Sequence, residues 1–220
     1  MTTNALDAAI RNRRTTKVFA DQPAERTTDR GRVNELIAAA TWAPFHRPAN
    51  KDHLGDAAGQ SSIVPWRFYV MDAAACRTMR SHLIEAGDAG KLPNMLAAAD
   101  CVIQVTWLPD PPKPEFAAAN PDALFEPTLQ NMEHIAAASA AIENLLLAAT
   151  DRGLESYWST GGALRQPPQF EMLGIPSTQI LLGAIFLFPE EEAGTTRVPG
   201  GLREKRGEEA DWCQWVSLGE

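Results

Sequence analysis

Apolar and polar positions alternate along the chain with a helical period in some segments and as short apolar runs in others. Apolar residues recur every three to four positions over 4–12, 32–42 and 73–86, which predicts three amphipathic helices. Asn4 is a candidate N-cap for the first helix, and Pro44 ends the second because proline has no amide hydrogen for a helix interior. Each helix would bury one face and expose the other.

A fourth helix, over 132–153, has a different pattern because it is apolar on most of its circumference. It is rich in alanine, and Gly153 stops it because glycine tolerates the left-handed conformation that often ends a helix. A helix that is apolar nearly all round is buried, either in the core of its own chain or against another subunit.

Short apolar runs predict strands. Residues 66–72 are rich in aromatic and β-branched side chains, and residues 101–107 are apolar almost throughout, which suggests burial on both faces. Residues 180–189 form a third buried strand, and residues 212–216 are a candidate last strand. Strands that alternate with long helices predict an α+β protein of two or three layers.

Three segments lack apolar periodicity and are predicted to be loops. Residues 43–65 exceed the length of a passive connection, and loops of that length are usually functional or disordered. Residues 87–94 form a shorter loop, and the proline-rich residues 109–122 predict an extended excursion over the surface.

Composition places the chain among single-domain globular proteins. It has 220 residues, of which 45% are hydrophobic and 22% charged, with no internal repeat or domain boundary. The net charge of −8 argues against a general nucleic-acid binder, which needs a broad basic face. No apolar run approaches the roughly 20 residues of a membrane span, and the N-terminus lacks the apolar stretch of a secretory signal.

The number and spacing of the cysteines and histidines bear on the cellular location and on metal binding. Cys76, Cys101 and Cys213 are odd in number and widely separated, which favours a reducing, cytoplasmic location over a disulfide framework. The four histidines are scattered and no zinc-binding spacing occurs, so no metal site is expected.

A local concentration of positive charge stands out in this acidic chain. Residues 11–19 read RNRRTTKVF, and in an extended segment Arg13, Thr15 and Lys17 would point to one side and converge on one anion. The simpler interpretation is a helix C-terminus whose cations favour the helix dipole. A second basic run, 202–207, is either a solvated surface or part of the same anion site.

Residues 153–162, GLESYWSTGG, hold small residues whose backbone amides can approach a ligand closely. The alternative is a helix stop and turn with Trp158 in the core. His46 and His53 lie in the long loop and are candidates for acid–base work, although loop histidines are usually only exposed.

Six segments, taken in order, resemble the FMN-dependent nitroreductase family. The family opens with a basic motif ending in Phe, has a helix ending in Ala-Pro followed by a Pro-Trp-x-Phe strand, and closes with a basic pair. The matching segments are Arg13–Phe19, 39–44, 64–68, 141–162, 181–189 and 202–206. Segment 141–162 resembles the family's central helix with its flavin loop, and segment 181–189 resembles its last core strand.

This resemblance implies a nitroreductase-like three-layer α+β sandwich with a central, mainly antiparallel sheet flanked by helices. It implies a domain-interlocked homodimer with FMN at the interface, which gives the apolar helix 132–153 a partner and lets residues 212–216 extend over it. Residues 1–220 would form one domain, with loop insertions at 45–64 and 109–122.

The resemblance also assigns residues to the cofactor. For the FMN phosphate and neighbouring ribityl hydroxyls it implies Arg13, Arg14, Thr15 and Lys17, closed by Lys205 or Arg206, with Arg203 also fitting the spacing. Along the isoalloxazine it implies Trp158, Ser159, Thr160 and Gly161, and at the pyrimidine edge Lys91 and Asn94. No catalytic side chain is implied, because the flavin carries the chemistry.

The substrate side departs from the family pattern. The family commonly has Ser-Ser-x-Asn after Ala-Pro, where this chain has Phe45, His46 and Arg47, and Val64 replaces the usual Gln before Pro-Trp. Phe45, His46 and Arg47 are therefore the candidates for a distinct acceptor pocket.

The expected activity is hydride transfer from NADH or NADPH through FMN to a small organic acceptor, by a ping-pong mechanism. Nitroaromatics, quinones and free flavin are all candidate acceptors. Alternatives are specialised reduced-flavin chemistry such as fragmentation or dehalogenation, a non-catalytic flavin-binding protein, and an interaction protein whose basic clusters are surface decoration. No nucleic-acid or membrane partner is expected.

Overall fold

A four-stranded antiparallel sheet forms the centre of the computed structural model, which describes residues 4–55, 61–189, 194–208 and 211–218. Its strand order is β2-β3-β5-β4. The bounds are Trp66–Asp72 for β2, Cys101–Trp107 for β3, Ile180–Phe188 for β5 and Glu155–Ser159 for β4. Residues 66–72, 101–107 and 180–189 were predicted as strands, and all three predictions are confirmed.

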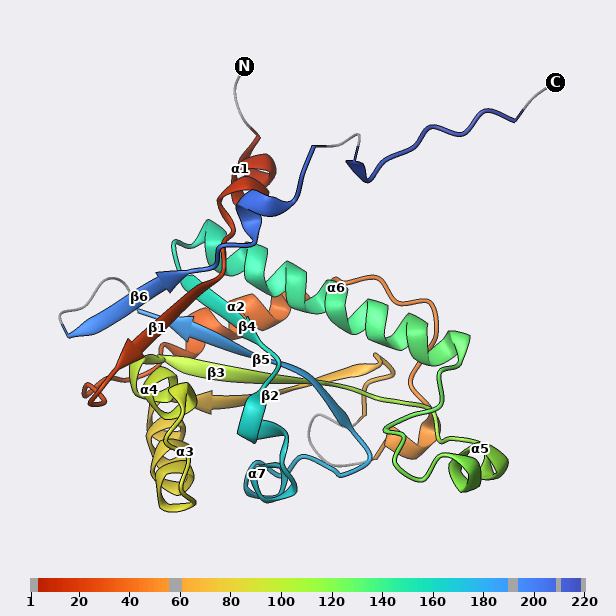
Figure 1. Cartoon of the computed structure of the whole chain (residues 1–220), viewed down its shortest axis with the longest axis horizontal. Coiled ribbons are helices and arrows are strands. Elements are labelled where there is room, and N and C mark those ends of the chain that lie inside the picture. The colour runs from red at the N-terminus through yellow and green to blue at the C-terminus, as the bar shows by residue number, and fades with distance from the viewer. Residues whose placement is uncertain (1–3, 56–60, 190–193, 209–210, 219–220) are drawn as a thin grey trace.

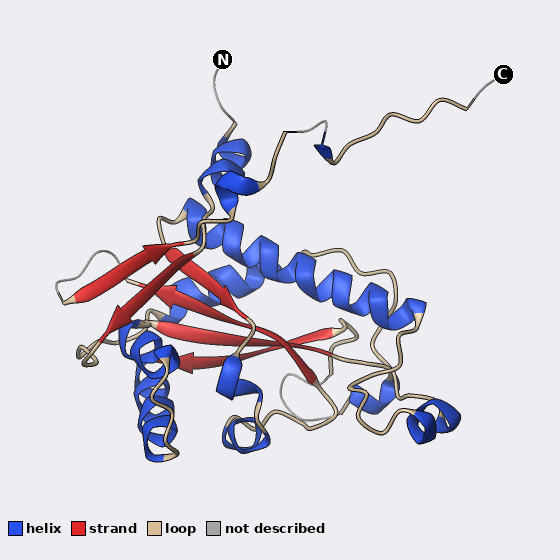
Figure 2. Cartoon of the chain, in the orientation of Figure 1, coloured by secondary structure: helices blue, strands red, loops and turns tan. Residues whose placement is uncertain are grey.

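Helices cover both faces of this sheet and make three layers (Figures 1 and 2). Helices α2 (Arg30–Ala40) and α6 (Leu129–Asp151) pack on one face, in an apolar cluster with Ile103 and Val105 of β3. Helices α3 (Ala73–Glu85) and α4 (Lys91–Ala98) cover part of the other face, in a cluster with Val102. The predicted mainly antiparallel three-layer α+β fold is confirmed.

Strand β3 is the central element because its side chains are buried on both faces. All seven of its residues are buried, as its nearly continuous apolar sequence predicts. Strand β3 contributes side chains to both apolar clusters. Burying one large aliphatic side chain stabilises the fold by roughly 1.5–3 kcal/mol.

Helix α6 begins at Leu129, three residues before the predicted start, because the Thr128 side chain accepts a hydrogen bond from the amide of Asn131 (3.2 Å) and caps the helix. Ala138, Ile142 and Leu145 are fully buried against the sheet. The helix ends at Asp151, and Gly153, the predicted stop, lies two residues beyond it with φ +72°.

A second, two-stranded sheet joins the two ends of the chain. Strand β1 (Thr16–Ala20) pairs antiparallel with β6 (Thr195–Pro199), and Thr15 forms a parallel bridge to Ser156 of β4. Helix α4 packs along β1. The short polar sequence of β6 gives no strand signal by itself, and its pairing with β1 makes it a strand.

Several predicted loops contain structure. The 87–94 prediction is wrong from Lys91 onward, because α4 starts there and tolerates Pro93 in its first turn, where no amide is needed. The 153–162 segment contains β4 before its turn. The proline-rich 109–122 segment contains α5 (Pro114–Ala119), which starts at a proline.

The predicted strand at 212–216 is wrong. These residues form a turn and irregular chain, and Trp212, Trp215 and Val216 are largely exposed. A strand requires a neighbouring strand for its backbone hydrogen bonds, and no described strand pairs with this segment.

The remaining elements are short. They are α1 (Ala5–Asn12), α7 (Pro167–Met172) and the 3₁₀ turns η1 (Lys51–His53), η2 (Gly162–Arg165) and η3 (Arg203–Lys205). None of the helices in the described residues has both the length and the apolar content to span a membrane.

The three thiols differ sharply in environment, which gives a testable difference in reactivity. Cys76 and Cys101 are buried, and desolvation raises the pKa of Cys101 to about 12 and that of Cys76 further, while Cys213 is exposed. Only the thiolate reacts. Near pH 8 we expect rapid reaction of Cys213 alone with an aromatic disulfide reagent, and of all three cysteines after unfolding.

Cys213→Ser should abolish the fast reaction, whereas rapid native labelling of two or more thiols would contradict the burial. The raised pKa values also set a sign for stability. The folded state holds these two thiol protons more tightly than the unfolded state, so their contribution is complete below the ordinary thiol pKa of about 8.5 and declines as pH rises above it.

Candidate functional site

The basic segment after α1 becomes an ordered, extended stretch leading into β1. Thr16, Val18 and Ala20 are buried, while Thr15 and Lys17 are only partly buried. Thr15 and Lys17 therefore share the more open side of the strand, as the alternation predicts. The Lys17 ammonium lies 5.1 Å from the centre of the Tyr157 ring, a cation–π distance that holds it over β4.

The C-terminal basic segment docks on this stretch. Arg203 donates from Nη1 to the backbone carbonyl of Arg13 (2.8 Å) across 190 residues of sequence, and from Nη2 to that of Arg11. The amide of Gly200 donates to the carbonyl of Thr15 (2.8 Å). The two basic clusters, distant in sequence, therefore lie together at the C-terminal end of α1 (Figure 1).

These contacts separate the three candidate C-terminal cations by role. The guanidinium of Arg203 is occupied by backbone carbonyls and ties η3 to the end of α1. Lys205 and Arg206 are exposed on and just after η3, and the Arg206 Nε donates only to the carbonyl of Arg203 (3.1 Å). Neither Lys205 nor Arg206 takes part in an ion pair among the described residues, and which of them reaches a phosphate stays a prediction.

Arg13 has a partner within the chain. Its Nε lies 3.1 Å from Glu143 Oε1 of α6, and its backbone amide closes α1 by donating to Ala9. Arg14 is exposed beside it. An anion at this site would compete with Glu143 for Arg13. The helix-end interpretation describes the position of Arg13, and the anion site stays a prediction.

The turn after β4 is built on glycine. Gly161 has φ +103°, and an added Cβ would lie 2.6 Å from Leu181 Cδ2. Its amide donates to Ser159 Oγ (3.1 Å), and Arg165 Nε donates to the carbonyl of Thr160. Because the Gly161 amide is engaged, the amide of Gly162, at the first position of η2, is better placed to meet a ligand. Gly162 belongs to the candidate segment 153–162 but was not assigned to the flavin, and its role stays a prediction.

Trp158 is partly buried and packs against the apolar cluster on the α6 face of the sheet. Its indole packs on Gly183 so closely that a Cβ there would stand 2.1 Å from Nε1. The alternative that placed Trp158 in the core describes this partly buried side chain only in part, and its assignment to the isoalloxazine stays a prediction.

Lys91 and Asn94 lie in the first turn of α4, next to the C-terminal end of β1. Asn94 Nδ2 is 3.4 Å from Oδ1 of Asp21, the residue after β1, and Lys91 is exposed. Helix α4 packs on β1, so both residues lie near this strand, and their assignment to the pyrimidine edge stays a prediction.

Comparison with known proteins now adds to this geometry. The model of the nitroreductase family matches residues 10–187. This chain belongs to the nitroreductase family. No curated protein sequence matches it.

Solved nitroreductase-family structures share its fold. A nitroreductase-like family protein from Bacillus cereus superposes with a TM-score of 0.61 at 20% identity, covering 99% of both chains. A family structure from Desulfovibrio desulfuricans in complex with FMN has a TM-score of 0.60 at 18% identity, covering 99% of this chain and 100% of that one. A nitroreductase with bound FMN from Bacteroides fragilis has a TM-score of 0.50 at 17% identity, covering 87% and 91%.

Within this nitroreductase-family chain, the candidate substrate residues lie apart from the basic clusters. Phe45 packs edge-on against Trp66 with ring centres 5.9 Å apart, and His46 and Arg47 approach Glu133 at 3.4 and 3.2 Å. Glu133 and Glu143, the partner of Arg13, are ten residues apart on α6, which is about 15 Å along a helix.

Phe45, His46 and Arg47 are therefore not brought to the basic clusters within one chain. Phe45 and His46 instead border an open groove over Ala136 and Ala140, near the N-terminal half of α6. Their role toward an acceptor stays a prediction.

Proposed function

We propose that this chain is an FMN-dependent oxidoreductase that transfers reducing equivalents from NADH or NADPH to a small organic acceptor. Its nitroreductase-family membership supports flavin-dependent oxidoreduction, and FMN occurs in two of the similar solved structures. The observation that supports the proposal is the docking of the C-terminal basic segment on the N-terminal one by Arg203, because it brings cations from both ends of an acidic chain close together.

The residues present fit an FMN phosphate. Arg13, Lys17, Lys205 and Arg206 supply positive charge and Thr15 a hydroxyl, a donor set that suits phosphate oxygens. The crowded turn at Gly161, where a side chain has no room, suits close approach of a flat ring to the backbone. Arg14 would add charge at the exposed rim.

Each group of residues has a proposed task. Bound FMN would take a hydride from the nicotinamide and deliver two electrons to the acceptor. Arg13, Thr15, Lys17, Lys205 and Arg206 hold the phosphate and neighbouring ribityl hydroxyls, while Lys91 and Asn94 place donors near the pyrimidine edge and favour negative charge there. The Ser159–Gly161 backbone, with Gly162, positions the rest of the ring.

A homodimer is part of the proposal. Large apolar side chains are exposed on α1, the α2–α6 face and the C-terminal segment, which favours cover by another protein surface. They include Leu6, Ile10, Trp42, Met132, Trp212 and Trp215. A second copy would also bring its Phe45, His46 and Arg47 toward a site that these residues do not reach in their own chain. We propose a cytoplasmic location for this dimer, because its cysteines are free.

The test is an anaerobic visible spectrum of the purified protein, before and after NADH and then NADPH. We expect flavin bands that bleach with at least one nucleotide and recover with a nitroaromatic or quinone. The same sample is expected to scatter light as twice the 24.0 kDa chain mass.

Bands that persist with both nucleotides would contradict the reductase and favour a flavin carrier or specialised reduced-flavin chemistry. A colourless protein that does not bind added FMN would contradict the cofactor proposal itself.

A further inference from the structure

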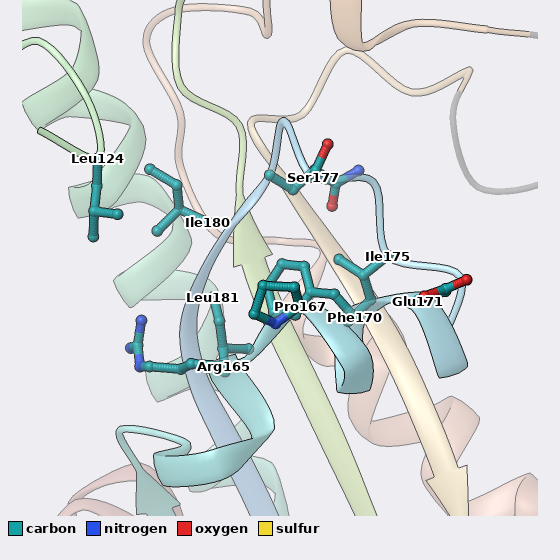
Figure 3. Close-up of a pocket in the computed structure, with 10 residues that line it drawn as sticks. Leu124, Arg165, Pro167, Phe170, Glu171, Ile175, Ser177, Ile180 and Leu181 are labelled. Atoms are coloured by element: carbon teal, nitrogen blue, oxygen red, sulfur yellow. The ribbon is translucent and has the colours of Figure 1, made fainter. Parts of the chain in front are cut away.

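A cavity of about 580 Å³ lies between α7, the start of β5 and the linker before α6 (Figure 3). This volume is typical of small-molecule sites. Most of its wall is apolar, formed by Leu124, Phe170, Ile175, Ile180 and Leu181. It reaches the glycine turn after β4, because Leu181 and Arg165 both line the cavity and both crowd Gly161.

One polar group in the wall is held in a defined orientation. Gln179 is 5% exposed, and its Oε1 accepts hydrogen bonds from the Tyr69 hydroxyl (3.0 Å) and the Thr106 hydroxyl (2.6 Å). Thr106 is completely buried, so this bond satisfies a hydroxyl that water cannot reach. With the oxygen end occupied twice, the amide NH₂ is the end of Gln179 that can donate to a ligand in the cavity.

The second polar group is a cation. Arg165 is anchored at the turn, with Nε donating to the carbonyl of Thr160 and Nη2 to that of Leu182 (3.4 Å). Desolvation lowers the pKa of Arg165, but an arginine stays charged near neutral pH. None of the ion pairs among the described residues involves Arg165. Figure 3 shows the one carboxylate of the wall, Glu171, on the opposite side of the cavity.

We propose that this cavity binds an aromatic carboxylate, with Arg165 taking the carboxylate and the Gln179 amide donating to a polar oxygen elsewhere on the ring. The flat apolar body fits between Phe170, Ile180 and Leu181. Resting on the proposed function, this ligand is the class of electron acceptor that the protein reduces.

For a nitro-substituted member of the class, the step balances as follows. NAD(P)H supplies two electrons and one proton as hydride by way of the flavin, and solvent supplies a second proton. The nitro group becomes nitroso, one N–O bond breaks, and its oxygen leaves as water.

The experiment compares 4-nitrobenzoate with 4-nitrobenzamide, which has nearly the same shape without the charge. Calorimetric binding to the flavin-loaded protein, without nucleotide, is expected to favour the carboxylate about tenfold, as one charge-assisted hydrogen bond allows. KM values with NAD(P)H should show the same ratio.

Three variants resolve the roles. Arg165→Gln should remove the tenfold preference, and Glu171→Gln should increase it by strengthening the binding of the carboxylate alone. Gln179→Met should weaken both ligands about equally. Arg32→Gln, on the exposed first turn of α2, is the matched charge control and should change neither affinity.

Equal binding of the two ligands by the unmodified protein, or an unchanged preference in Arg165→Gln, would overturn the proposal. A failure of the proposed function would give a different result from a failure of this proposed site. If the flavin does not bleach with NAD(P)H but Arg165 still governs carboxylate binding, the site stands and its role as an acceptor site falls. Thermal unfolding of each variant shows that it remains folded.

Discussion

Replacing Gly183 by alanine is expected to lower the free energy of unfolding by about 3 kcal/mol, the upper range for overpacking a core. The new Cβ would lie 2.1 Å from Nε1 and 2.6 Å from Cδ1 of Trp158, and 3.0 Å from the backbone oxygen of Ser159. The indole packs against the apolar cluster on the α6 face of the sheet, which restricts its rotation away from the new Cβ. Denaturant unfolding at one fixed protein concentration measures the change.

Gly201→Ala is the matched control. A Cβ on Gly201 meets no atom within 4 Å, and its backbone is not left-handed, so stability should stay within about 0.5 kcal/mol of the parent. If Gly183→Ala were equally neutral, the indole would not be packed on β5 as described. Because β4 leads directly into the Gly161 turn, the Gly183 variant should also weaken FMN binding, whereas the Gly201 variant should not.

Replacing Arg13 by alanine is expected to weaken FMN binding by about 1.5–3 kcal/mol, the size of a lost hydrogen bond to a charged group. That corresponds to a loss of affinity of roughly 10- to 150-fold. The physical reason is the loss of one guanidinium from the anion site formed by the two basic clusters. Titration of the apoprotein with FMN, followed by quenching of flavin fluorescence, measures the change.

Riboflavin is the control ligand because it lacks the phosphate. Its affinity should be the same in Arg13→Ala as in the parent, and Arg32→Ala should alter neither flavin. Glu143→Gln should strengthen FMN binding several-fold, since it frees Arg13 from its 3.1 Å ion pair. An equal loss for FMN and riboflavin, or no loss for either, would show that Arg13 does not contact the phosphate.

Much of the fold could be predicted from local pattern because its main elements carry strong signals. Strand β3 is apolar along its whole length and lies in the middle of the sheet, buried on both faces. Helix α6 is apolar on most of its circumference and is the long helix that packs on that sheet. Because their burial requires apolar side chains at nearly every position, the apolar sequence directly predicts that these two elements are buried.

Elements with weak local signals depended on their neighbours. Residues 195–199 are a strand only because β1 offers them an open edge, and residues 212–216, with better β-forming side chains, have no strand beside them. Helix α4 was hidden by Pro93, which a first helical turn accepts. In each case the structure depended on whether a hydrogen-bonding neighbour was present, or on the position of a residue within a helix. The composition of a short segment does not carry this information.

The candidate site divides in the same way. The residue types at 13–17 and 202–206 were sufficient to predict an anion site and a second basic cluster, because charge is a property of the residue itself. Only the tertiary structure shows that the Arg203 guanidinium joins these clusters, that Glu143 pairs with Arg13, and that Trp158 packs against the core. The cavity with Arg165 and Gln179 likewise joins segments that carry no shared motif.

The sequence by itself determined the α+β class, the buried strands, the long apolar helix and the positive charge at both ends of the domain. The tertiary structure alone decided which cations remain available, which turn glycine is crowded and which polar groups face a cavity. The physical reason is that periodicity and charge act within a few residues. Hydrogen bonds such as that from Arg203 to Arg13 depend on segments 190 residues apart meeting in space.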